Sequence, residues 1–292
     1  MNRLTGDGMP FGWTINPFRG CEVGCSYCYA RSTHEFLGHS EPAEFEERIY
    51  VKSGDLRALE AELCRARDSG REIAIGTATD PYQPAEQRFG VTRRVLETMA
   101  RVPGLRVGIT TKSALVTRDV PLLADLARTS DLWVNMSLIS LDADLLRLIE
   151  PRAPRPDLRL GAVRAVTRAG VRARIFVMPV LPLITDGAGG LLELLRSARA
   201  AGAHEAISQA LFLRTPPVHA HFFEWLEREF PWAVARYRAL FPRPGSAPAE
   251  IRAEIDRLVA TQALRAGFAA RNREARIRDE APPRPRQLSL VW

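Results

Sequence analysis

Strand-like segments alternate with helix-like segments along this sequence, which predicts an α/β fold: a partial (β/α)6 TIM-like barrel with a C-terminal helical extension. Neighbouring parallel strands cannot be joined by tight turns, so each intervening helix fits a right-handed crossover. The predicted strand ends are more polar than the strands themselves, as expected where a barrel binds a polar ligand. A length of 292 residues suits one such domain.

Each element is predicted from a local pattern. Short apolar runs predict strands at residues 13–16, 73–77, 105–110, 132–139, 171–178 and 206–212. Apolar residues at helical spacing predict helices at 53–70, 91–102, 119–127, 155–170 and 189–202. Glycine ends two of these helices, at Gly70 and Gly170. The polar strand ends are residues 77–80, 110–113, 135–137 and 179–182.

The sequence after the barrel is helical in character. Residues 219–241 are rich in aromatic side chains, and their roughly helical spacing favours packing of two helices over a stacking platform for bases. Residues 248–276 predict a further helix, and a proline-rich tail follows. We therefore expect a barrel core at 1–215, a helical extension at 216–280 and a disordered tail at 281–292.

Composition restricts the class of protein. The formal net charge of +7 permits a nucleic-acid partner without requiring one. Lys52 and Lys112 are the only lysines among 41 basic side chains, an arginine bias that genome composition explains as well as phosphate binding. No run approaches the roughly 18 apolar residues of a membrane span, and the first eight residues contain no apolar signal core. These features predict a cytoplasmic protein with no membrane partner.

Three of the four cysteines form one motif, Cys21-x-x-x-Cys25-x-x-Cys28. Three thiolates bind a four-iron cluster and leave one iron open for a ligand. A structural zinc site requires four ligands, and the remaining cysteine, Cys64, lies far away in a predicted helix. The third alternative is three unrelated buried thiols, since free cysteine is often a small core residue.

With Tyr27 before the third cysteine, this motif resembles that of the radical SAM superfamily. The resemblance implies that Cys21, Cys25 and Cys28 hold a [4Fe-4S] cluster whose open iron binds S-adenosyl-L-methionine. The reduced cluster then cleaves that cofactor to methionine and a 5′-deoxyadenosyl radical, with Tyr27 against the adenine. It also implies an electron donor such as flavodoxin or ferredoxin.

A closer resemblance, over roughly residues 12–215, is to the branch that contains spore photoproduct lyase and uncharacterised relatives. It rests on residues 28–31, 79–86, 111–113, 118–119, 150–151 and 179–182. The resemblance implies that Lys112 and Ser137 contact S-adenosyl-L-methionine. It places Asp80 and Glu86 in the same cavity, although an Asp before proline also forms turns without any function.

The same resemblance identifies candidate catalytic positions. Tyr27 and Tyr29, which flank the third cysteine, match tyrosines of the lyase. Thr77 aligns with the cysteine by which the lyase returns a hydrogen atom to its product radical, and a threonine O–H bond is too strong for that step. His34 and Glu35, beyond the cysteine motif, are expected either to shape the site or to begin a helix.

The last residues, Gln287–Trp292, resemble the short motif by which bacterial repair and replication proteins bind the DNA sliding clamp. Three functions follow. The favoured one is a radical SAM enzyme that acts on a nucleic-acid base in DNA repair or modification. The others are radical SAM modification of a peptide or small metabolite, and a non-enzymatic cluster protein that binds DNA or the clamp.

Overall fold

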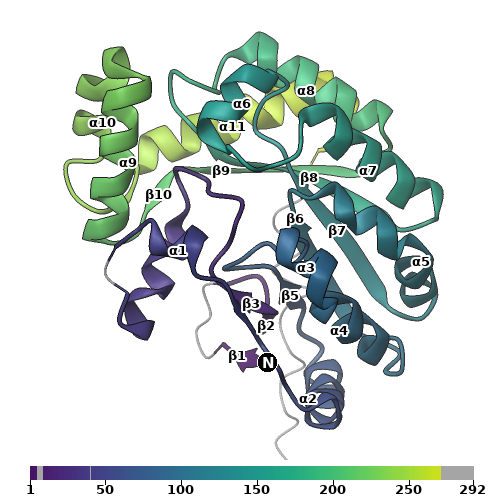
Figure 1. The fold of residues 1–292 in the computed structure, drawn as a ribbon. Coiled ribbons are helices and arrows are strands. Elements are labelled where there is room, and N and C mark those ends of the chain that lie inside the picture. Colours follow the sequence, from purple (N-terminus) through teal and green to yellow (C-terminus); the bar gives the residue numbers. More distant parts are fainter. Residues whose placement is uncertain (5–8, 40, 271–292) are drawn as a thin grey trace, which may run out of the picture.

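The structure, a computed structural model, describes residues 1–4, 9–39 and 41–270. Its main feature is a curved sheet of seven described strands in the order β1-β2-β5-β6-β7-β8-β9 (Figure 1). Neighbours from β2 to β9 are all parallel, and β1 pairs antiparallel with β2. These strands are β1 Asn2–Arg3, β2 Trp13–Ile15, β5 Ile73–Ile75, β6 Arg106–Thr111, β7 Asp131–Ser137, β8 Arg172–Val180 and β9 Glu205–Ala210.

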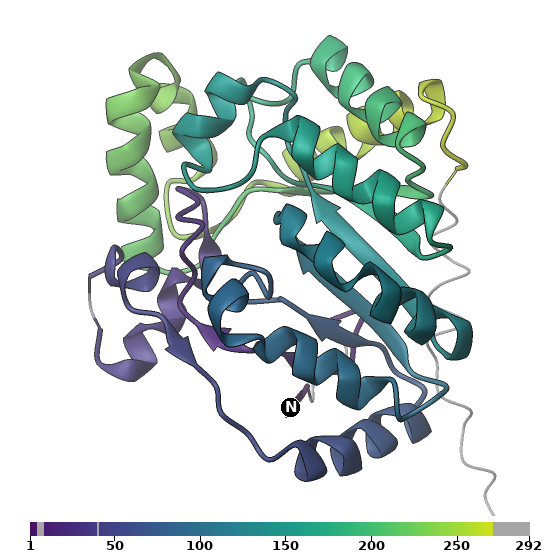
Figure 2. The ribbon, with the colours of Figure 1, turned by 45° about the vertical axis from the view of Figure 1, so that its right-hand side comes forward.

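Helices cover the convex face of this sheet, and α4, α5 and α7 lie side by side there (Figure 2). The helices of the barrel are α2 Leu56–Asp68, α3 Pro84–Phe89, α4 Val91–Met99, α5 Val120–Thr129, α6 Ala143–Ile149, α7 Pro156–Arg168 and α8 Ala188–Ala200. Two small antiparallel sheets lie outside the main one: β3 Phe18–Arg19 with β4 Tyr50–Val51, and β10 Phe212–Leu213 with β11 Gly245–Ser246.

The two faces of the sheet differ in polarity. Alternate residues point under the helices and form the core, among them Ile73, Ile75, Val107, Ile109, Leu132 and Val134. The residues between them face the concave side. There Asn135 Nδ2 donates to Thr110 Oγ1 at 3.3 Å, and a Cβ on Gly108 would lie 3.3 Å from the same nitrogen. The concave side is therefore lined in part by polar groups.

The predicted fold class and all six predicted strands are confirmed. The predicted elements do not include β1, β3, β4, β11, α3 and α6, which are all short. A strand of two residues has no readable alternation, and helices of six and seven residues span two turns or fewer. The segments α1 Glu44–Glu47, η1 Tyr29–Thr33, η2 Glu35–Leu37 and η3 Ala114–Asp119 are single turns or 3₁₀ helices.

The C-terminal helices take two different positions. The helices α9 Pro216–Glu229 and α10 Val234–Leu240, with η4 Pro231–Ala233 between them, pack against each other (Figure 1), and α9 contacts η1. The expected core packing of their aromatic side chains is confirmed, except that Trp232 is 63% exposed. Helix α11 Ala249–Arg265 instead packs against β9 and α8. Within the described ranges, no helix is both long and apolar enough to cross a bilayer.

Candidate active site

The three-cysteine loop follows β3 and lies on the concave side of the sheet (Figure 1). Cys21 and Cys25 are buried, and Cys28 is half-buried. The backbone N–H of Cys21 donates to Phe45 O at 2.8 Å. Cys28 precedes η1, and its N–H donates to Cys25 O at 3.2 Å. The loop is thus fixed by backbone hydrogen bonds at both ends of the motif.

Two glycines let the loop turn closely against its neighbours. Gly20 and Gly24 adopt φ angles of +81° and +69°, in the left-handed region that favours glycine. A Cβ on Gly20 would lie 2.5 Å from Arg48 O, and one on Gly24 would lie 2.6 Å from Glu46 Oε2. Neither position accepts a larger residue without movement of its neighbours.

A buried arginine, Arg31, fixes the cysteine loop by hydrogen bonds and an ion pair. The side chain of Arg31 donates from Nη2 to Cys25 O at 3.1 Å and forms an ion pair with Glu46 at 3.0 Å. Its Nη1 donates to Pro42 O at 2.8 Å. Gln83 holds the opposite side of the loop, because its amide donates to Gly20 O and accepts from the backbone N–H of Glu22.

The donor set suits an iron–sulfur cluster. Burial raises the pKa of Cys25 to about 12 and also raises the pKa of Cys21, and a bound metal displaces such protons and stabilises thiolates. The backbone N–H of Asp80 points to Cys21 Sγ at 3.4 Å, as N–H groups do toward cluster sulfurs. Among the described residues, no three His, Cys, Asp or Glu side chains converge on one metal ion. Cluster cysteines bind separate irons and need no such convergence.

Asp80 joins two strand ends. Its carboxylate accepts hydrogen bonds from the Tyr82 N–H at 2.9 Å, the Thr111 hydroxyl at 2.6 Å and the Lys112 N–H at 2.8 Å. Both carboxylate oxygens are therefore engaged within the protein. Asp80 fixes the loop after β5 against the end of β6 and directs its own N–H to Cys21.

Lys112 lies beside the cysteine loop. Its ammonium is 5.7 Å from the centroid of the Tyr27 ring. Burial lowers its pKa, but the neighbouring Cys25, Glu150 and Asp80 outweigh that effect, so the pKa of Lys112 is raised and its side chain is charged. Lys112 is thus a cation at the end of β6 and next to the proposed cluster ligands.

Tyr29 and Thr77 meet on the other side of the loop. The Tyr29 hydroxyl donates to Thr77 O, and the Thr77 hydroxyl accepts from Asn16 Nδ2 at 3.1 Å. The Tyr29 side chain remains 42% exposed, with its ring 6.4 Å from that of Phe212. The structure thus brings together the two predicted positions, and it exposes an aromatic surface beside the cysteines.

The structure corrects the expectation for Glu86, which does not line the same cavity. Its side chain is fully buried and accepts from the backbone N–H groups of Thr92 and Arg93 at the start of α4. It also forms an ion pair with Arg118 at 2.7 Å. A carboxylate at a helix N-terminus accepts hydrogen bonds from N–H groups that have no partner within the helix. Glu86 therefore fixes the start of α4.

His34 and Glu35 lie in the short 3₁₀ segments after the motif, and both contact neighbouring chain segments. His34 Nε2 bonds with Arg48 O at 2.9 Å, and Glu35 accepts from the Thr215 hydroxyl at 3.5 Å. The segment η2 begins at Glu35 with His34 directly before it, as the helix-start role predicted, but the His34 side chain makes no capping hydrogen bond there.

A family model described as the radical SAM superfamily matches residues 15–195, most of the chain and all of the strands from β5 to β8. The chain belongs to the radical SAM superfamily. An uncharacterized protein of Mycobacterium tuberculosis (strain H37Rv) is 36% identical over 282 residues, which are 97% of this chain and 82% of the relative.

Two solved structures match as well. Spore photoproduct lyase complexed with dinucleoside spore photoproduct has a TM-score of 0.68 at 17% identity, covering 91% of this chain and 77% of the lyase. SuiB of Streptococcus suis, bound to its precursor peptide SuiA, has a TM-score of 0.52 at 16% identity, covering 78% of this chain and 48% of SuiB. Both comparisons show a shared fold. Membership of the superfamily implies an enzyme that uses a [4Fe-4S] cluster and S-adenosyl-L-methionine.

The sequence analysis missed several residues that shape this radical SAM site. Arg31, Glu46, Glu150 and Arg159 carry charges that are largely or fully buried around the cysteine loop. Arg31 and Glu150 stand in the blocks 28–31 and 150–151 that carry the family resemblance, although no role in the site was inferred for them. Nothing local distinguishes Arg159 from the exposed arginines of the chain. Ser137 was predicted, and it lies buried at the end of β7 with its hydroxyl 3.5 Å from Met178 O. The proposed tail motif, Gln287–Trp292, lies outside the described residues.

Proposed function

We propose that this radical SAM protein uses its cofactors to modify or repair a nucleic-acid base. In this proposal Cys21, Cys25 and Cys28 hold the cluster, which supplies an electron for cleavage of S-adenosyl-L-methionine to a 5′-deoxyadenosyl radical. The buried thiols, the N–H group directed at Cys21 and the cationic Lys112 beside the loop support this assignment.

The residues at the strand ends receive S-adenosyl-L-methionine in this proposal. Lys112 attracts its carboxylate, because a lysine ammonium is a compact charge suited to an anion. Tyr27, whose ring lies beside that ammonium, provides a flat surface for the adenine. Ser137 provides a hydroxyl at the end of the neighbouring strand. Asp80 does not contact the cofactor in this proposal; it acts through Lys112, whose backbone it fixes by a hydrogen bond.

A nucleic-acid substrate is supported by one observation in particular, the exposed ring of Tyr29 beside the cysteine loop, with the half-buried ring of Phe212 next to it. Tyr29 and Phe212 present ring surface at the end of the barrel where the loop lies, and bases taken out of a helix stack on such rings. The exposed Arg214, whose charge influences Tyr29, suits a phosphate. The fold shared with spore photoproduct lyase, solved with a dinucleoside photoproduct, agrees with this substrate class.

The hydrogen-atom donor must differ from that of the lyase, since Thr77 stands at the matching position. We assign Tyr29 to this part of the site because its phenol group reaches the carbonyl of Thr77. A peptide substrate is the second candidate, supported by the fold shared with SuiB in complex with its precursor peptide.

The test is anaerobic reconstitution with iron and sulfide, followed by reduction in the presence of S-adenosyl-L-methionine. The readout is 5′-deoxyadenosine, measured with ultraviolet-damaged DNA, undamaged DNA or a peptide mixture. A rise with damaged DNA alone is expected. A rise with peptides alone would refute the nucleic-acid substrate, and no 5′-deoxyadenosine from a fully loaded protein would favour a binding protein.

The cluster ligands have a control within the chain. Cys25→Ala is expected to lose the iron and the charge-transfer absorbance of the cluster. Cys64→Ala is expected to keep both, because Cys64 lies on α2 and packs against the core. Equal iron in the two variants would refute the ligand assignment.

Binding partners are tested separately. DNA affinity that falls steeply with added salt would show phosphate contacts. Removal of Gln287–Trp292 is expected to abolish binding to the sliding clamp and leave 5′-deoxyadenosine formation unchanged. Flavodoxin or ferredoxin is the proposed electron donor, and replacement of the chemical reductant by either protein tests it.

A further inference from the structure

A fully buried ion pair lies behind the cysteine loop. Arg159 Nη2 and Glu150 Oε2 are 2.6 Å apart, and neither side chain is exposed at all. Glu150 follows the end of α6, and Arg159 lies in the first turn of α7. Removing two charges from water costs about as much as their attraction returns. Stability alone is therefore a weak reason for this pair, and its other contacts indicate what it does.

Arg159 joins three separate groups. Besides the carboxylate of Glu150, its Nε donates to Pro154 O at 2.7 Å and its Nη1 donates to Ser137 O at 3.1 Å. Ser137 is the last residue of β7, at the end of the barrel that carries the proposed cofactor site. A guanidinium is planar and rigid, so these contacts fix the end of β7 relative to Glu150.

Glu150 continues the connection into the cysteine loop. Its second carboxylate oxygen accepts a hydrogen bond from the Tyr27 hydroxyl. Tyr27 lies between Cys25 and Cys28, so this bond reaches the middle of the motif. The backbone adds a parallel contact, because the N–H of Ser26 donates to Ile149 O at 3.0 Å. An unbroken series of contacts thus runs from the Ser137 carbonyl to the cysteine loop.

We propose that Glu150 and Arg159 are positioning residues that hold the Cys25–Cys28 side of the loop at a fixed separation from Ser137. S-adenosyl-L-methionine must reach both a cluster bound by the loop and the strand ends, so this separation sets its affinity. The inference rests on the proposed function of the site. In this inference the buried ion pair serves to position the cofactor site and not to stabilise the fold.

The principal variant is Arg159→Lys. Lysine keeps the positive charge opposite Glu150 but loses the planar group that reaches Ser137 O and Pro154 O together. We expect the Kd for S-adenosyl-L-methionine to rise about tenfold, the low end of what loss of a group that orients a metal site costs. The iron content is expected to stay that of the parent. Equilibrium dialysis of the anaerobically reconstituted protein measures the Kd.

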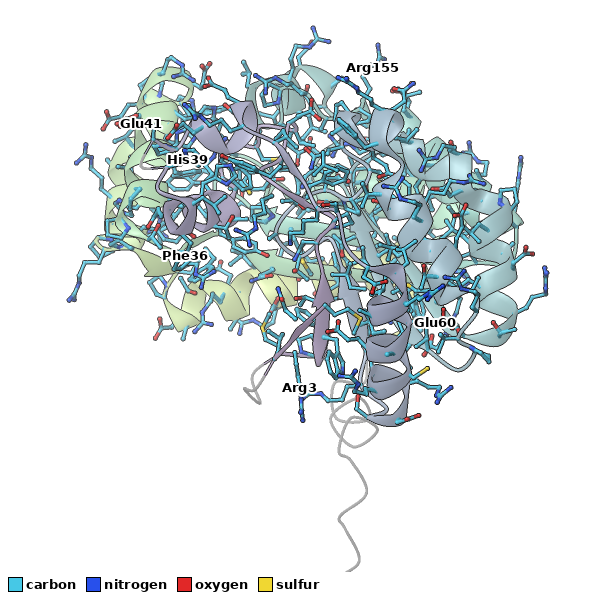
Figure 3. All side chains as sticks on the ribbon, turned by 60° about the horizontal axis from the view of Figure 1, so that its bottom comes forward. Arg3, Phe36, His39, Glu41, Glu60 and Arg155 are labelled. Atoms are coloured by element: carbon cyan, nitrogen blue, oxygen red, sulfur yellow. The ribbon has the colours of Figure 1, made fainter. Side chains whose placement is uncertain are left out.

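A spectroscopic readout separates positioning from general structure. The electron paramagnetic resonance spectrum of the reduced cluster changes when a ligand binds its open iron. In Arg159→Lys we expect this change to require about tenfold more S-adenosyl-L-methionine, in step with the Kd. The control is Arg155→Lys directly before α7, whose ion pair with Asp157 is exposed and which projects from the surface (Figure 3). Its Kd and spectrum are expected to match the parent.

If Arg159→Lys fails to fold, the double variant Glu150→Gln/Arg159→Gln replaces it. Two neutral amides can bond to each other, and replacing a whole buried pair costs less than breaking one. The same rise in Kd is expected, since the contact with Ser137 O is lost. A Kd within twofold of the parent in either folded variant, even with lower thermal stability, would overturn the inference. A parent protein that binds no S-adenosyl-L-methionine would instead refute the proposed function.

Discussion

Replacement of Gly24 by alanine tests whether the cysteine loop depends on its close contact with Glu46. The added Cβ would lie 2.6 Å from Glu46 Oε2, so the carboxylate must move away from Arg31, which it contacts at 3.0 Å. Holding a residue with a Cβ in the left-handed region at φ +69° costs about 1 kcal/mol. Loss of a hydrogen bond between charged groups adds about 2 kcal/mol. We expect the free energy of unfolding to fall by about 3 kcal/mol.

Gly38→Ala is the matched control. Gly38 has φ +81°, and a Cβ there meets nothing within 4 Å. Only the backbone cost of about 1 kcal/mol is expected for this variant. For a chain of this size about 1 kcal/mol corresponds to ~2 °C in Tm, so the two variants are expected to melt about 6 °C and 2 °C below the parent. Urea denaturation of the metal-free, reduced protein measures the difference directly.

A double-mutant cycle identifies the cause. In Glu46→Ala the ion pair with Arg31 is already absent, so adding Gly24→Ala is expected to cost only about 1 kcal/mol more. Equal effects of the Gly24 and Gly38 variants would refute the steric argument. A full 3 kcal/mol effect of Gly24→Ala in the Glu46→Ala background would show that the strain arises elsewhere.

Three further predictions concern charge and chemistry at the site. Lys112→Met is expected to weaken S-adenosyl-L-methionine binding by about tenfold or more, as loss of a charged hydrogen bond does. The control Lys52→Met is expected to bind like the parent, and equal Kd values for the two variants would remove Lys112 from the site. Burial and a neighbouring arginine lower the pKa of His221 from 6.5 to about 4. As the pH drops from 6.5 toward 4, the unfolded chain therefore binds a proton at this histidine before the folded protein does, and the free energy of unfolding falls. His221→Gln is expected to flatten that slope in urea titrations, and an unchanged slope would contradict the assignment. Tyr29→Phe is expected to lower the amount of product formed per 5′-deoxyadenosine. Thr77→Val is expected to leave that ratio unchanged, because it keeps the backbone carbonyl. A lower ratio in Thr77→Val alone would reverse the roles of the two residues.

The barrel strands were predictable because each has a strong local signal. A run such as Ile73–Ile75 is apolar on both faces and is followed by a turn sequence. Helix α6 could have been predicted from its N-cap, because an aspartate before an apolar run is a typical N-cap. In the structure Asp142 accepts hydrogen bonds from the N–H groups of Asp144 and Leu145. The predicted helix at 248–276 begins correctly, but α11 ends at Arg265, two residues before Gly267 at φ +87°.

The cysteine motif follows from spacing, and the meeting of the strand-end residues at one end of the sheet follows from the topology of a parallel barrel. The groups that hold them in place were not predictable. Arg159 has the same local surroundings in sequence as many exposed arginines, and the block that contains Arg31 did not indicate what its side chain contacts; only tertiary contacts bury both side chains. Glu86 shows a different error, since the family resemblance placed it in the same cavity as Asp80 while its carboxylate faces the start of α4. Glu86 lies on the short helix α3, and the direction in which such a helix turns each side chain depends on packing, which the family motif does not encode.

The order of strands in the sheet also has a consequence for access. In the described residues, β1 and β9 are the two ends of the sheet and do not pair with each other. A closed eight-stranded barrel admits a ligand only through its mouth, so a polymer would have to offer a free end or a protruding loop. In an unclosed sheet the two edge strands are not paired, so strand pairing does not seal the concave face on that side. A long chain can lie against such an opening and present one internal unit to the interior, with no need to be threaded or cut.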